Sequence, residues 1–210
     1  MKSVTLCIVS LMWCLNLIAT DYHFVANEDH QYVNPANWTP SYPGVEIQEN
    51  DRVFIDTDAV YEGLNLEING SLEIAIGATL SSASGELRVR ESGVCNTYGT
   101  LRVKGLRVWG AVLNNTPGRF MLTFLAVRST GSLSNFPGAT VSVKGDLANL
   151  GKFLNYGHVS VGNNVILMKT SAFHQIGRAE LLVRGTLTAA PDAMLEQAPE
   201  SYVQIAEVTP

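Results

Sequence analysis

The sequence predicts an all-β protein that folds as a single-stranded parallel β-helix, or β-solenoid, with about 20 residues per coil. Its clearest feature is a pattern of aliphatic residue, variable position, Val, cation and Gly. This pattern recurs at a constant interval, in 101–105, 141–145 and 181–185. Short apolar–polar alternations separated by Gly and Asn fill most of the remaining chain, and no window has the period of a long amphipathic helix. Stacked coils must repeat because each position lies above its counterpart. The alternative fold is a β-sandwich or jelly roll, whose strands need not repeat in sequence.

Residues 1–20 have the layout of a secretory signal peptide. Lys2 precedes an apolar run from residue 4 to residue 15, and the small residues Ala19 and Thr20 follow. The run is too short for a good membrane span, and no later apolar stretch approaches the required length. We therefore expect a secreted or cell-surface protein without a membrane span. The alternative is that this segment forms the first element of the mature fold.

Residues 21–60 differ from the repeats and predict an N-terminal cap. The segment contains three prolines and an unusual density of aromatic residues: Tyr22, Phe24, Tyr32, Trp38 and Tyr42. Irregular, aromatic sequence at the start of a solenoid is typical of a segment that covers the open end of the first coil, which would otherwise offer unpaired backbone groups to other chains.

Part of this segment also resembles known proteins. Asn34-Pro-Ala-Asn-Trp38, then Pro43-Gly44, then Asp51-Arg-Val-Phe-Ile55 is similar to the entry sequence of bacterial secreted β-helical surface proteins of the adhesin or autotransporter type. More loosely, it resembles the opening of G8-type extracellular domains. The resemblance covers about 35 residues and implies a parallel β-helix with an adhesive or glycan-related role. It assigns no catalytic residue to any position of this chain.

Residues 61–210 are expected to form the stacked coils. Six aliphatic residues in regular alternation predict one buried stripe: Leu64, Leu66, Ile68, Leu72, Ile74 and Ile76. Asn114 and Asn155 occupy corresponding places in successive copies of the repeat, and we expect them at tight corners, where Asn tolerates positive φ. Four aromatic residues are also expected near corners: Trp109, Phe136, Tyr156 and Phe173. Seven or eight coils stacked at about 4.8 Å give a rod about 35 Å long.

The candidate binding residues are the cations of the repeated pattern, Lys104, Lys144 and Arg184. In coils of about 20 residues they align on one face, two coils or about 9.6 Å apart. Residues 86–169 carry ten Lys and Arg against three acidic residues, so this ladder lies in a basic region that could hold an acidic polysaccharide. The plainer interpretation is that these cations are solvated side chains that discourage edge pairing.

Other chemistries have little support in the sequence. Asp51, Asp56 and Asp58 form the only dense acidic set and lack the spacing of a calcium loop. Glu67 with Glu73 could be nominated for glycoside hydrolysis, but isolated Glu on alternating strands is ordinarily solvent-facing. The four histidines show no metal-ligand spacing, so we expect no metal, no cofactor and no catalytic residue. With Cys7 and Cys14 in the signal segment, Cys95 remains alone and is expected to be a buried small hydrophobe.

The function that the sequence favours is a non-catalytic, secreted, adhesin-like module. Its flat solenoid face would bind glycan, such as an acidic polysaccharide, or another surface protein. A structural subunit that self-associates through the terminal coil and a polysaccharide lyase or glycoside hydrolase are the alternatives. Nucleic acid is not an expected partner, because the chain is acidic overall, with a pI near 5.3.

Overall fold

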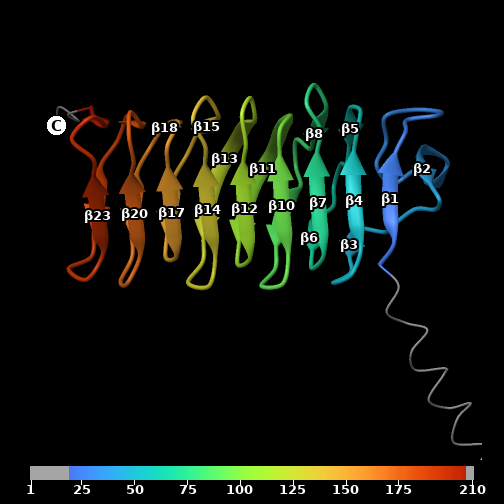
Figure 1. The fold of residues 1–210 in the computed structure, drawn as a ribbon, viewed down its shortest axis with the longest axis horizontal. Coiled ribbons are helices and arrows are strands. Elements are labelled where there is room, and N and C mark those ends of the chain that lie inside the picture. Colours follow the sequence, from blue (N-terminus) through green and yellow to red (C-terminus); the bar gives the residue numbers. More distant parts are fainter. Residues whose placement is uncertain (1–18, 207–210) are drawn as a thin grey trace, which may run out of the picture.

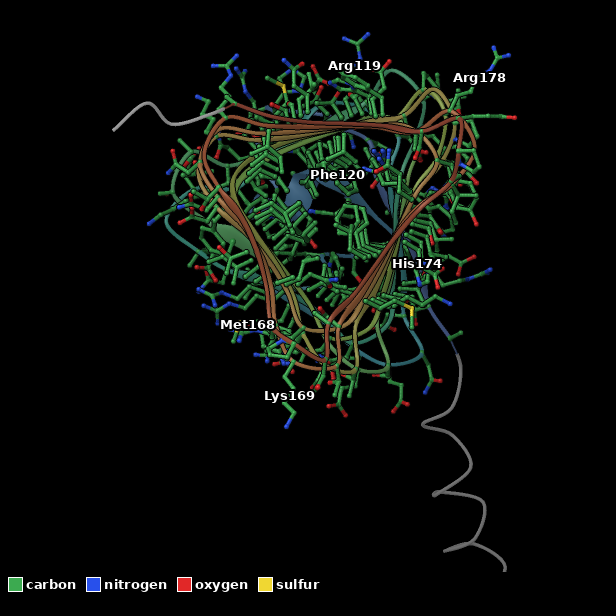
Figure 2. All side chains as sticks on the ribbon, turned by 90° about the vertical axis from the view of Figure 1, so that its left-hand side faces the viewer. Arg119, Phe120, Met168, Lys169, His174 and Arg178 are labelled. Carbon is green, nitrogen blue, oxygen red and sulfur yellow. The ribbon has the colours of Figure 1, made fainter. Side chains whose placement is uncertain are left out.

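The computed structural model describes residues 19–206 and confirms the β-solenoid. The chain winds through about eight turns of about 21 residues each, seen side by side in Figure 1. Viewed end-on, the coils form a three-sided tube whose interior is filled with side chains (Figure 2). The predicted signal peptide, residues 1–20, lies outside the described residues except for its last two. The only helix in the described part is the short 3₁₀ helix Pro35–Asn37.

From β4 to β22 each turn crosses three faces in the chain order A, B, C. Face A is a single parallel sheet that consists of β1 (Asp21–Phe24), β4 (Arg52–Ile55), β7 (Ser71–Ile74), β10 (Val94–Thr97), β12 (Ala111–Asn114), β14 (Ser132–Asn135), β17 (Lys152–Asn155), β20 (Ala172–Gln175) and β23 (Met194–Gln197). The two-residue strand β2 (Trp38–Thr39) pairs antiparallel with β1 at the end of this sheet.

Faces B and C are joined into one sheet by two long strands, β11 (Thr100–Val108) and β13 (Arg119–Val127), which run across the corner between them. Their first halves belong to face B, with β5 (Ala59–Val60), β8 (Thr79–Ser81), β15 (Thr140–Val143), β18 (His158–Val161), β21 (Glu180–Val183) and β24 (Tyr202–Ile205). Their second halves belong to face C, with β3 (Glu46–Ile47), β6 (Leu66–Ile68), β9 (Glu86–Val89), β16 (Leu147–Asn149), β19 (Val165–Leu167) and β22 (Leu187–Ala189).

Alternation along each strand decides what lies inside the tube. In β15 Val141 and Val143 are buried whereas Ser142 between them is exposed, and most other strands repeat this pattern. In the last coil the alternation is lost, and β22, β23 and β24 have no buried residue. The stripe expected from Leu64 to Ile76 is correct for its four middle members, which are buried. It is wrong for Leu64 and Ile76, which are 41% and 70% exposed, because both lie beyond strand ends, where the alternation stops.

A ladder of buried amides occupies one inner corner of the tube. Asn114 Nδ2 donates to Asn135 Oδ1, Asn135 Nδ2 to Asn155 Oδ1, and Asn155 Nδ2 to Gln175 Oε1, at 2.8, 2.8 and 2.7 Å. The four side chains come from β12, β14, β17 and β20 and are almost fully buried. Asn114 and Asn155 do lie at a corner, as the last residues of β12 and β17, but neither has the positive φ that was expected there. They point inward, where each amide satisfies its counterpart in the next coil.

Phe173 is a second correction. It was expected near a corner but lies in β20, fully buried, with its ring centroid 4.7 Å from that of Phe153 in the preceding coil. Trp109, Phe136 and Tyr156 do lie just beyond strand ends, and the Phe136 and Tyr156 rings stack at 5.9 Å.

An aromatic cluster closes the N-terminal end of the core. Trp38 packs edge-on against Phe24 and Tyr32, and its Nε1 donates a 2.6 Å hydrogen bond to the carbonyl oxygen of Tyr32. Tyr42 and Tyr61 also pack edge-on against Tyr32. The stacked coils begin before residue 61, since β3, β4 and β5 pair in parallel with β6, β7 and β8.

Candidate functional site

The three cations of the repeated pattern lie in one column along face B. Val103, Val143 and Val183, each the residue before a ladder cation, occupy the same register position in β11, β15 and β21. Lys104, Lys144 and Arg184 are exposed, and the strands between them separate neighbouring cations by two coils, or about 9.6 Å. We call these three residues the basic ladder.

Small residues alternate with the cations in this column. Leu122 of β13 stands between Val103 and Val143 in the register, and Val161 of β18 stands between Val143 and Val183. The residues that follow them are Thr123 and Gly162. The column therefore reads cation, Thr, cation, Gly, cation from β11 to β21.

Two adjoining open hollows follow the basic ladder, and we call them together the groove. Its first part, about 440 Å³, runs over β8, β11, β13 and β15, and its second part, about 240 Å³, over β15, β18 and β21. Ser142 and Lys144 line both parts, so the two lie next to each other along the solenoid axis. Arg102, in β11, adds a fourth cation to the wall.

The groove cations carry uncompensated charge. In the part of the chain that the structure describes, none of Arg102, Lys104, Lys144 and Arg184 forms an ion pair. The one acidic residue in the lining is Glu62, at the N-terminal end. Like charges held on one low-dielectric wall reinforce one another and attract an anion.

Glu62 is held in place by hydrogen bonds from the next coil. Its carboxylate accepts from the backbone N–H of Ala83 and from Ser84 Oγ, at 2.9 and 3.0 Å. The Ala83 N–H, followed by Ser84, lowers the pKa of Glu62 below its ordinary value. The carboxylate is thus a fixed negative charge where the groove begins. No motif in the sequence indicated its position.

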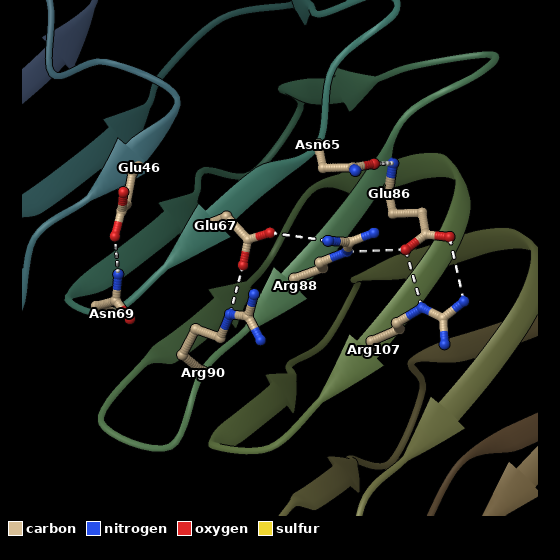
Figure 3. A network of polar contacts seen from close by, with 8 residues as sticks. All are labelled: Glu46, Asn65, Glu67, Asn69, Glu86, Arg88, Arg90 and Arg107. Atoms are coloured by element: carbon tan, nitrogen blue, oxygen red, sulfur yellow. Dashed lines mark hydrogen bonds and ion pairs between the residues drawn. The ribbon is translucent and has the colours of Figure 1, made fainter.

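Three other arginines of the basic region, Arg88, Arg90 and Arg107, belong to a different face. Figure 3 shows them interleaved with glutamates on the outside of face C. Glu67 pairs with Arg88 and Arg90, and Glu86 pairs with Arg88 and Arg107, with contacts of 3.1 Å from Glu67 to Arg88 and 2.9 Å from Glu86 to each of its arginines. The Arg107 hydrogen bond is the largest cause of the lowered pKa of Glu86. The cations of the basic region therefore do not form one broad basic face.

The acidic residues considered for catalysis are scattered. Glu67 is engaged by arginines on face C, whereas Glu73 lies on face A, so the two carboxylates do not face each other across a site. Asp56 accepts from His23 at 3.0 Å, and Asp58 accepts the backbone N–H of Thr79 at 2.8 Å. Among residues 19–206, no three His, Cys, Asp or Glu side chains gather closely enough to hold a metal ion.

Two histidines and the cysteine also have structural environments that explain them. His158 and His174 each place Nδ1 within 2.9 Å of a glutamate carboxylate in the next coil. Cys95 is fully buried in β10, and burial raises the pKa of its thiol to about 12. A thiol with that pKa is not an activated nucleophile.

Comparisons with family models, curated proteins and solved structures find no match to this chain. The described part of the chain also contains no helix with the length and apolarity needed to cross a bilayer. Function must therefore be inferred from the groove and its charges.

Proposed function

We propose that the protein is a non-catalytic, secreted or cell-surface module that binds an acidic polysaccharide along the groove of face B. The observation that carries the proposal is the coincidence of three features in one place. The groove follows the solenoid axis, four cations line it, and these cations have no acidic partner in residues 19–206. A linear polyanion fits such a site, because its charges recur along its length as the cations recur along the groove.

The same geometry disfavours catalysis at this site. Hydrolysis of a glycosidic bond needs two facing carboxylates, and the lining supplies Glu62 alone, tied to Ala83 and Ser84. Location outside the cell follows from the signal peptide predicted for residues 1–20. It also gives the groove access to extracellular and cell-wall glycans.

The test is retention on immobilised polysaccharides with simultaneous analysis of released chain ends. We expect retention on acidic polysaccharides but not on neutral dextran, without cleavage, and weaker retention as salt is raised. The double variant Lys104→Glu, Lys144→Glu should weaken binding at least about tenfold, because two favourable contacts become repulsive.

A matched control is Lys152→Glu with Lys169→Glu, which changes the net charge equally. Lys152 lies on face A and Lys169 beyond the end of β19, both exposed and away from the groove. Equal losses in both double variants would mean that net charge, and not the groove, causes retention. Release of new chain ends would replace the proposal with an enzymatic one, and absence of retention would leave a structural role.

A further inference from the structure

The spacing within the basic ladder carries information about the ligand that net charge does not. Cations stand at every second coil of the column, at Lys104, Lys144 and Arg184, and the intervening positions are Thr123 and Gly162. Positive charge in this column thus has a period of two coils, about 9.6 Å, on a backbone whose own period is about 4.8 Å.

The groove dictates the direction in which a chain-like ligand lies. Its two parts share Ser142 and Lys144 and cross β8, β11, β13, β15, β18 and β21 in succession. A bound polymer must therefore run along the solenoid axis, perpendicular to the strands, and pass one coil after another. In an extended polysaccharide one pyranose unit has about the length of one coil spacing, so successive sugars lie over successive coils.

We infer that the polysaccharide bound in this groove carries its acidic group on every second sugar. This inference rests on the proposed function and adds the repeat of the ligand to it. In such a chain each carboxylate faces a ladder cation. Each neutral sugar lies over Thr123 or Gly162, whose side chains are small and uncharged. In a polymer with a carboxylate on every sugar, only every second carboxylate can face a ladder cation, so about half of its charge has no counter-charge in the column.

The ends of the groove set the length of the bound segment. From Lys104 to Arg184 the column spans four coil intervals, about 19 Å, which corresponds to about five sugars. Beyond Lys104 the groove meets the fixed carboxylate of Glu62. An anionic chain is repelled there, so its acidic units are confined to the part of the groove between β11 and β21.

The experiment compares two octasaccharides by calorimetry with the purified protein at fixed salt. One is hyaluronan, in which uronate alternates with a neutral sugar, and the other is oligogalacturonate, in which every sugar is a uronate. We expect the hyaluronan octasaccharide to bind at least about threefold more tightly, although it has half the charge. Tighter binding of the oligogalacturonate would overturn the inference.

The substitution Thr123→Lys tests the register directly. Thr123 is exposed and points outward from β13, so a lysine is accommodated and puts cations on three consecutive coils. The ratio of the two dissociation constants should then shift about threefold or more toward oligogalacturonate. An unchanged ratio would contradict the match between the cation spacing and the ligand repeat. A positive charge that is not matched to the ligand repeat would strengthen the binding of both octasaccharides alike.

A triple variant separates failure of this inference from failure of the proposed function. Changing Lys104, Lys144 and Arg184 to Gln should abolish the difference between the two ligands and weaken both. The control triple of Lys152, Lys169 and Arg178 to Gln has the same charge change outside the groove. If neither octasaccharide binds the unmodified protein, or if both triples weaken binding equally, groove binding itself is wrong. If binding depends on the ladder but the ratio does not respond to Thr123→Lys, only the alternating repeat is wrong.

Discussion

The substitution Asn135→Ala tests whether the buried amide ladder stabilises the solenoid. Asn135 is fully buried and makes two side-chain hydrogen bonds of 2.8 Å, one from Asn114 and one to Asn155. Each contributes about 1 kcal/mol net, because the partners keep other bonds: Asn114 Nδ2 to the Thr140 carbonyl and Asn155 Oδ1 from the Gly157 N–H. The lost side chain also leaves a small cavity that costs about 1 kcal/mol. We therefore expect a loss of about 3 kcal/mol in the free energy of unfolding.

The assay is equilibrium unfolding in urea, followed by circular dichroism and by tryptophan fluorescence, so that a loss of two-state behaviour in a repeat protein is detected. The control is Asn96→Ala, because Asn96 faces outward from β10 and its side chain makes no hydrogen bond within residues 19–206. A loss below about 1 kcal/mol for Asn135→Ala, or an equal loss for Asn96→Ala, would refute the ladder as a stabilising element. A double-mutant cycle with Asn155→Ala should give a coupling of about 1 kcal/mol.

Three further predictions follow from buried or paired groups. Glu86→Gln should destabilise the protein at pH 7. Arg107 lowers the folded-state pKa of Glu86 below its ordinary 4.5. The stability difference between the variant and the unmodified protein is therefore fully present above pH 4.5 and disappears as the pH falls through that lowered pKa, which urea titrations at several pH values would show. A stability difference that persists at the lowest pH would contradict the pairing. Gly105→Ala should cost about 1–3 kcal/mol, because a Cβ there would lie 2.1 Å from the Phe124 ring; the cost, measured by urea unfolding, should fall when Phe124→Leu is combined with it. Cys95 should not react with a disulfide reagent in the folded protein and should react fully in urea, since its thiol is buried and its pKa is raised to about 12; rapid labelling of the folded protein would be inconsistent with this environment.

The period of the solenoid could be predicted because two successive coils together contain a constant number of residues, whereas the number of residues in a single coil varies. Leu101 pairs with Phe120, and Phe120 pairs with Val141, so a shorter coil is followed by a longer one. The next two coils in the same column, from Val141 to Val159 and from Val159 to Leu181, are again one shorter and one longer. The two differences cancel, which makes the distance along the chain from Leu101 to Val141 equal to that from Val141 to Leu181. The repeated pattern is therefore visible at two coils, whereas the intermediate coils share only their apolar character.

The inward direction of the amide ladder could not be deduced from Asn114 and Asn155 alone. Asn is favoured at corners, where it tolerates positive φ, and it is also stable inside a tube if its amide has a counterpart in each neighbouring coil. Only Asn135, which stands one coil from each of the other two in the register, distinguishes the cases. The sequence alone does not place Asn135 in this column, because the register of single coils cannot be derived from the two-coil repeat.

The same register explains why one set of cations is free to bind a ligand and another is not. Arg88 has Glu67 directly opposite it one coil earlier, and Arg107 reaches Glu86 diagonally on the preceding coil, where its own register partner is Arg88. Each arginine thus forms an ion pair with a carboxylate of the neighbouring coil and is neutralised within the fold. Lys144 has Thr123 on one side and Gly162 on the other. Its nearest charged neighbours in the column are cations two coils away, and nothing in the column pairs with it. In a β-solenoid, then, a charge that has an opposite charge within reach on the neighbouring coil is neutralised within the fold. A charge that recurs with the same sign at every second coil contributes little to the fold and leaves a patterned potential on the surface, and this is the physical basis for the proposal that the groove of face B binds a polyanion.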